Sequence, residues 1–250
     1  MKKIIIANWK MNPGTLIEAK ELFDSLKEIS REFRETEIII CAPFVWLENF
    51  SSQGGLKRGL SLGGQNCHWE SHGAFTGEIS ASMLADLKAG YVIIGHSERR
   101  QYLGENDLII NAKIKAALKA KIKPIVCVGE RQNEEMHLVV EDQIRSALNG
   151  IPAAQLKEIV IAYEPVWAIG PGDPCSPDNA LSANLFIKKV LTKLYNRAGA
   201  EKTAIVYGGS VDRKNAADYL SRSQMAGLLI GGASLDAQEF GEIIKSVGNI

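Results

Sequence analysis

Short apolar runs alternate with longer amphipathic stretches along the chain. The short runs are apolar at almost every position, which is typical of parallel strands covered by helices on both faces. The longer stretches carry apolar residues at helical spacing, as in 15–33, where Ala19, Phe23 and Leu26 fall on one face. We predict strands at 3–7, 37–42, 60–64, 91–95, 122–128, 159–163, 204–207 and 227–230. We predict helices at 15–33, from 45 onward, and at 81–89, 109–120, 134–148, 181–197, 216–220 and 240–247.

Eight strand–helix units favour a closed (β/α)₈ barrel of the α/β class, with eight parallel strands inside and helices outside. The alternative is an open, doubly wound sheet, which usually has a glycine-rich turn after its first strand. Here that turn is NWKMN at 8–12, without Gly-x-Gly spacing. No linker or low-complexity segment interrupts the repeat, so we expect residues 1–250 to form one domain.

Charge and cysteine content narrow the possible partners. Lys plus Arg equals Asp plus Glu, 29 each, which argues against a nucleic-acid or membrane surface because both need clustered positive charge. The apolar run at 4–7 is too short for a signal peptide, and no run reaches membrane-spanning length. The cysteines are far apart and suggest neither a metal site nor a disulfide framework. We expect a cytoplasmic protein without a bound metal.

The residue that most needs a chemical explanation is Glu164. An apolar strand, 159–163, leads directly to this carboxylate, and Pro165 follows. A carboxylate at the exit of a buried strand is partly desolvated, which suits a general base. Trp167, with the glycines and prolines after it, suggests a hinged lid that excludes water. The ordinary alternative is a surface glutamate before a loop.

Other polar residues also fall where predicted strands end. In a (β/α)₈ barrel the active site lies at these carboxyl ends, so the residues are expected to converge. Taken singly, a histidine, a lysine or a glycine pair has an ordinary structural explanation. Their shared placement favours an active site. The strand ends carry Asn8, Lys10, Gln65, Asn66, His96, Ser97, Glu98, Cys127, Glu164, Gly208, Gly209, Ser210, Gly231 and Gly232.

Two glycine pairs mark the last two strand ends, in YGGSV at 207–211 and IGGAS at 230–234. Glycine lets backbone N–H groups approach an anion, and a short helix beginning near Gly232 would direct its positive end toward it. The pattern predicts a phosphate-bearing ligand. Gly170 could add an N–H group from the lid.

Seven motifs, in order and over the whole length, resemble the triosephosphate isomerases. The resemblance implies interconversion of dihydroxyacetone phosphate and glyceraldehyde 3-phosphate in glycolysis and gluconeogenesis, with no cofactor. The motifs are NWKMN at 8–12, GAFTGE at 73–78, GHSERR at 95–100, CVGE at 127–130, AYEPVWAIG at 162–170, YGGSV at 207–211 and GGAS at 231–234.

The resemblance also implies residue roles. A carboxylate can remove a proton next to a carbonyl only if the developing oxyanion is stabilised at the same time. By resemblance Glu164 moves the proton and His96 donates to the carbonyl oxygens. Lys10 supplies positive charge and Asn8 a polar contact. The phosphate is bound by Gly170, Ser210, Gly231 and Gly232.

The resemblance implies a homodimer formed through the loop 66–78, which begins at Asn66 and ends at Glu78 and brings Thr76 near the partner's site. The family commonly has TGKTA after Gly170, whereas this chain has PGDPC at 171–175. Pro171 and Pro174 fix the backbone and remove N–H donors, so we expect a stiffer lid. Cys175 is expected to be exposed and sensitive to oxidation.

Two other functions stay open from the residues alone. One is a lyase or aldolase in which Lys10 forms a Schiff base with a sugar phosphate. The other is a non-catalytic phosphate-binding homologue, which would be free to lose Glu164, His96 or Lys10. All three are present.

Overall fold

Eight parallel strands close into a barrel in the part of the chain that the computed structural model describes, residues 2–33, 35–52, 59–169 and 174–248. Each strand pairs with the next along the chain, and the first pairs with the last. The strands are β1 (Lys3–Asn8), β2 (Thr36–Cys41), β3 (Leu60–Gly64), β4 (Tyr91–Ile94), β5 (Lys123–Val128), β6 (Val160–Tyr163), β7 (Ala204–Tyr207) and β8 (Gly227–Ile230).

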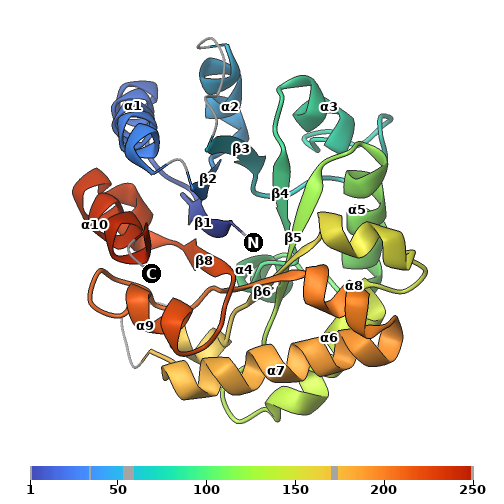
Figure 1. Ribbon diagram of the computed structural model, residues 1–250. Helices are drawn as coiled ribbons and strands as arrows, with labels where there is room; N and C mark the ends of the chain where they lie inside the picture. Colours follow the sequence, from blue (N-terminus) through green and yellow to red (C-terminus); the bar gives the residue numbers. More distant parts are fainter. Residues whose placement is uncertain (1, 34, 53–58, 170–173, 249–250) are drawn as a thin grey trace.

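Helices surround this barrel, and α10 lies beside α1 where the ring closes (Figure 1). The α-helices are α1 (Leu16–Glu32), α2 (Phe44–Ser51), α3 (Ala81–Asp86), α4 (Ser97–Tyr102), α5 (Asp107–Lys119), α6 (Met136–Ala147), α7 (Pro177–Leu194), α8 (Arg197–Lys202), α9 (Ala216–Ser221) and α10 (Ala237–Gly248). Short 3₁₀ turns are η1 (Ala153–Glu158), η2 (Val166–Ala168) and η3 (Gly232–Leu235). The (β/α)₈ prediction is confirmed.

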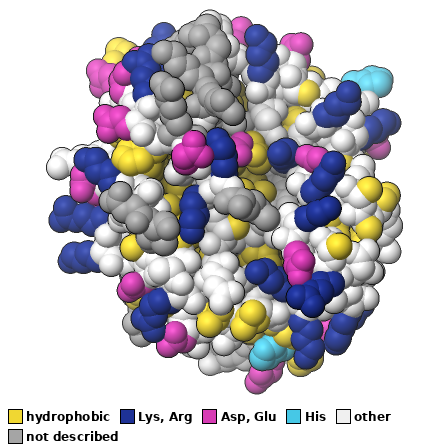
Figure 2. All heavy atoms as spheres, in the orientation of Figure 1, with side chains coloured by type: hydrophobic (Ala, Val, Ile, Leu, Met, Phe, Trp, Pro, Cys, Tyr) yellow, Lys and Arg dark blue, Asp and Glu magenta, His cyan; other side chains and the backbone are white. Residues whose placement is uncertain are grey.

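Buried side chains form two layers. Ile6, Ile39 and Ile125 point into the barrel, and Ile5, Ile38 and many others fill the space between strands and helices. Both faces of the strands are therefore apolar, which explains why the sequence runs are continuous. Figure 2 shows Lys and Arg side chains interspersed with Asp and Glu over the face that it draws, as a net charge of zero leads one to expect.

Local signals at the helix ends explain where the predicted bounds were wrong. The helix predicted from 181 begins at Pro177, because Ser176 caps it by accepting from the N–H of Asn179. It ends at Leu194, and Asn196 caps a separate helix, α8, which the periodicity did not resolve. The predicted start at 15 is correct to one residue, since Thr15 and Glu18 form a capping box at α1.

Candidate active site

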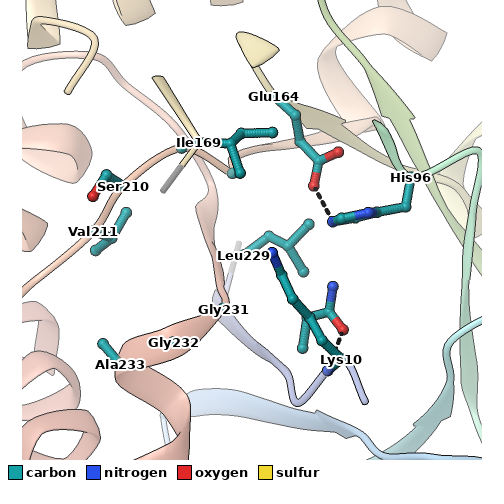
Figure 3. Close-up of a pocket in the computed structure, with 13 residues that line it drawn as sticks. Lys10, His96, Glu164, Ile169, Ser210, Val211, Leu229, Gly231, Gly232 and Ala233 are labelled. Carbon is teal, nitrogen blue, oxygen red and sulfur yellow. Dashed lines mark hydrogen bonds and ion pairs between the residues drawn. The ribbon is translucent and has the colours of Figure 1, made fainter. Parts of the chain in front are cut away.

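A cavity of about 230 Å³ opens at the carboxyl ends of the strands (Figure 3). Glu164 and His96 form one side of it, the side chain of Lys10 enters from another, and the glycine-rich turns after β7 and β8 form the rest. Its lining residues are Asn8, Lys10, His96, Glu164, Ile169, Gly208, Gly209, Ser210, Val211, Leu229, Gly231, Gly232 and Ala233.

Glu164 lies one residue beyond the end of β6 and is only 2% exposed. Its backbone N–H donates to the Val128 carbonyl, which extends the sheet pairing to the carboxylate itself. One carboxylate oxygen, Oε1, lies 3.4 Å from His96 Nε2. The other, Oε2, is buried without a hydrogen-bond partner among the described residues. The carboxylate is therefore more desolvated than the sequence suggested.

Gly129 allows the backbone of Glu164 to come this close to β5. A β-carbon at position 129 would lie 1.9 Å from the Glu164 carbonyl oxygen, so no other residue fits without moving the strand. The sequence placed Gly129 in a motif but gave no reason for it. The reason is a contact between residues that are far apart in the chain.

His96 occupies the N-cap position of α4. Its Nδ1 accepts a hydrogen bond from the backbone N–H of Glu98 at 3.3 Å. A neutral imidazole has one N–H, so this bond places the proton on Nε2, the nitrogen that faces Glu164 and the cavity. The ring therefore presents a hydrogen-bond donor to a ligand.

Lys10 follows β1 with a backbone φ of 52°, a left-handed conformation that is uncommon outside glycine. Its N–H donates to Asn8 Oδ1 at 3.1 Å, and its carbonyl accepts from Gln65 Nε2 at 2.8 Å. The ammonium group pairs with Glu98 Oε1 at 2.6 Å. Gln65 and Glu98 therefore fix Lys10, a function that the sequence did not assign to Gln65.

The glycine-rich side of the cavity is suited to an anion. The Ser210 N–H donates to the Ala168 carbonyl at 2.9 Å, which joins the turn after β7 to η2. At Gly232, where η3 begins, a β-carbon would meet no atom within 4 Å, so the backbone faces open space. A side chain at Gly231 would instead approach Lys10 Cε at 3.3 Å. Gly170, the remaining predicted phosphate contact, lies outside the described residues.

Two cysteines are placed away from the cavity surface. Cys127 is buried in the barrel, where burial first and then the neighbouring Glu164 raise its pKa well above the ordinary value. The prediction that Cys175 is exposed is wrong, because the residue is 1% exposed. The Tyr219 hydroxyl donates to its backbone carbonyl, and burial raises the pKa of its thiol to about 12.

Trp167 donates from its indole N–H to Glu130 Oε1 at 2.7 Å, and the Tyr163 hydroxyl donates to the same carboxylate. This buried carboxylate anchors the segment just beyond Glu164. The sequence singled out Trp167 for bulk alone and missed this polar anchor.

Among the described residues, no cluster of three or more His, Cys, Asp or Glu side chains could hold a metal ion. In the same part of the chain, no helix is both long enough and apolar enough to cross a membrane.

The fold places the chain among the (β/α)₈-barrel proteins, and its cavity lies at the carboxyl ends of the strands, where barrel enzymes have their active sites. The family model described as Triosephosphate isomerase matches residues 3–247. The chain belongs to the triosephosphate isomerase family.

Curated relatives agree with this placement. The chain is 42% identical over 250 residues to the triosephosphate isomerase of Dictyoglomus turgidum, with 98% of this chain and 99% of the relative covered. It is 43% identical over 252 residues to that of Aquifex aeolicus, with 98% and 100% covered. It is 44% identical over 254 residues to that of Carboxydothermus hydrogenoformans, with 98% of each covered.

Proposed function

We propose that this chain interconverts dihydroxyacetone phosphate and D-glyceraldehyde 3-phosphate through an enediolate, as a step of glycolysis and gluconeogenesis. Family membership and identities of 42–44% over almost the whole chain support this activity. The observation that carries the mechanism is the 3.4 Å separation of Glu164 Oε1 and His96 Nε2 at the wall of one cavity. A three-carbon phosphate bound in the cavity beside this pair would meet a base and a hydrogen-bond donor together.

In this mechanism Glu164 removes the proton from one carbon of the substrate and returns it to the next. A buried carboxylate is a stronger base toward carbon than a hydrated one, because no water competes for its charge. The Nε2–H of His96 donates to the oxygen that gains negative charge. Asn8 and Lys10 add a polar contact and a positive charge on the same side. The hydroxyl proton of the substrate must also pass to the former carbonyl oxygen, which completes the isomerisation with no atom gained or lost.

We assign the substrate phosphate to the glycine-rich side of the cavity, where Ser210, Gly231 and Gly232 would contact it. The open space at Gly232 supports this role, because backbone N–H groups there can approach an anion. Gly170 is proposed as a further contact. Lys10, whose side chain lines the same cavity, places a positive charge near the proposed phosphate.

The test is a coupled isomerase assay on the wild type and on Glu164→Gln, with deuterium uptake from solvent followed by NMR. Gln keeps the size of the side chain but cannot accept the proton. We expect kcat to fall about 10²- to 10⁴-fold and deuterium uptake to fall with it. Wild-type protein that does not interconvert the two triose phosphates would contradict the proposal.

The Schiff-base alternative is disfavoured at Lys10. A Schiff-base lysine must lose its proton, which desolvation or a neighbouring cation favours. Here the side chain is 32% exposed and forms an ion pair with the Glu98 carboxylate 2.6 Å away, so its surroundings are solvated and acidic. Borohydride in the presence of substrate should therefore leave the mass of the protein unchanged.

We also propose that two copies assemble through the loop 66–78, with Thr76 near the partner's site. Within this loop the Trp69 ring stacks on His68 with centroids 4.1 Å apart, and the Phe75 ring lies tilted against the same imidazole at 4.3 Å. Both remain about two-fifths exposed, at 40% and 43%. Large aromatic surfaces on a well-ordered loop are typical of protein interfaces.

The other expectations remain proposals. Residues 1–250 are proposed to act as one domain in the cytoplasm. A lid is proposed over the segment that follows Trp167; of its two prolines, Pro174 is exposed and Pro171 lies outside the described residues. Temperature-jump measurements of Trp167 fluorescence should show faster closure in Pro171→Thr plus Pro174→Thr, and equal rates would contradict a stiffening effect.

A further inference from the structure

Tyr219 connects two parts of the site that are distant in the sequence. It lies on α9, is 1% exposed, and donates from its hydroxyl to the backbone carbonyl of Cys175 at 2.5 Å. Its ring stacks on Tyr207, with centroids 4.0 Å apart and planes at 20°. Burial raises the pKa of Tyr219, so the phenol keeps its proton and remains a donor at neutral pH.

Tyr207 in turn supports the turn assigned to the phosphate. It is the last residue of β7 and is fully buried. A β-carbon at Gly209 would lie 2.0 Å from the Tyr207 hydroxyl, so this hydroxyl lies directly beneath the turn. A shift of the Tyr207 ring would therefore shift Gly209 and Ser210, and the Tyr219 ring is stacked on it.

Cys175 lies just before α7 in the chain. The next residue, Ser176, is the N-cap of that helix. The Ala168 carbonyl, in η2, accepts from the Ser210 N–H. The turn after β7 is thus tied to Ala168 directly, and to Cys175 through Tyr207 and Tyr219.

A second contact fixes α9 to the same turn. Asn215 lies at the N-cap position of α9, and its Nδ2 donates to the Ser210 carbonyl at 3.3 Å. The helix that carries Tyr219 is therefore attached to Ser210 at its start and to Cys175 through Tyr219.

We propose that Tyr219 is a positioning residue that sets the phosphate-binding turn against the backbone at Cys175, just before α7. This inference rests on the proposed function, because the turn matters only if it binds the substrate phosphate. A purely apolar residue at this position would fill the same space but would leave the buried Cys175 carbonyl without this donor, which costs free energy. The hydroxyl is the part of the side chain that gives the position a functional role.

The test is Tyr219→Phe, which removes the hydroxyl and keeps the ring stack. We expect kcat/KM for glyceraldehyde 3-phosphate to fall about fivefold to tenfold, the factor that one hydrogen bond is worth. Deuterium exchange of glyceraldehyde, which lacks the phosphate, should not change. Affinity for glycerol 3-phosphate, measured by calorimetry, should fall by a similar factor.

Tyr195→Phe is the matched control. The Tyr195 hydroxyl also donates to a backbone carbonyl, that of Leu148, at 3.0 Å, but away from the cavity. This variant should keep wild-type kinetics and affinity. Equal losses with glyceraldehyde and with its phosphate in Tyr219→Phe, or no loss with either while the wild type is active, would overturn the proposal. A wild type without isomerase activity would instead overturn the proposed function.

Discussion

Glu164 packs so closely against Gly208 that a β-carbon at position 208 would lie 2.7 Å from its Cγ and 3.3 Å from its Oε1. The glycine therefore sets the position of the carboxylate and also belongs to the turn assigned to the phosphate. Because Gly208 has no side chain, it leaves room for Glu164, the proposed base, and it also forms part of the proposed phosphate-binding turn.

Gly208→Ala should consequently act on catalysis through Glu164. The added methyl group pushes the carboxylate from its place opposite His96, and a misplacement of this size lowers the rate about 10- to 100-fold. Steady-state kinetics should show a loss mainly in kcat. Gly90→Ala is the control, because a β-carbon there would meet no atom within 4 Å. An unchanged kcat in Gly208→Ala would contradict the close packing.

Glu98→Gln tests how Lys10 is held. The pair is partly exposed, with side chains at 32% and 43%, so its contribution to stability is at most about 1 kcal/mol and the melting temperature should hardly change. Without the carboxylate the ammonium group of Lys10 is less well fixed, and kcat/KM should fall about tenfold. Glu141→Gln removes a similar pair with Arg145 on α6 and should leave the kinetics unchanged. A large loss of stability with normal kinetics would refute the positioning role.

The buried thiols should be inert in the native protein. Burial raises the pKa of Cys67 and Cys175 from 9.0 to about 12, so at pH 8 the thiolate fraction is about a thousandfold lower than in the unfolded chain. Ellman's reagent should therefore label both cysteines only after unfolding. Rapid native labelling of Cys175 would restore the oxidation-sensitive hypothesis that its burial now opposes.

The same thiols give stability a pH dependence with a definite sign. Their folded pKa lies above the unfolded one, so the folded state holds protons that the unfolded state releases. Stability is unaffected by these groups below pH 9 and falls as pH rises from 9 toward 12. Urea unfolding of the wild type and of Cys175→Ala should show a weaker alkaline loss in the variant.

The proposed interface can be tested at Phe75. Phe75→Asp places a charge on the exposed aromatic surface of the loop 66–78 and should shift the wild-type dimer to monomer. Light scattering coupled to gel filtration should give twice the 27.3 kDa of one chain for the wild type and a single chain mass for the variant. Leu185→Asp, at a leucine that is 51% exposed on α7, is the control and should remain dimeric. A monomeric wild type would contradict the interface.

The sequence determined the barrel, because the spacing of apolar residues that distinguishes a strand from a helix is a local property of the chain. Strands 60–64, 204–207 and 227–230 were predicted with their observed ends. Because barrel sites form at the carboxyl ends of strands, the sequence also pointed to Glu164, His96 and Lys10.

Only the tertiary structure decided how those residues meet. Glu164 is buried rather than half exposed because Gly129 and Gly208 let β5 and β7 close around it. Lys10 pairs with Glu98, 88 positions away, and Cys175 is hidden beneath Tyr219. Burial and pairing of this kind depend on which distant segments pack together, and a local pattern of polar and apolar residues does not contain that information.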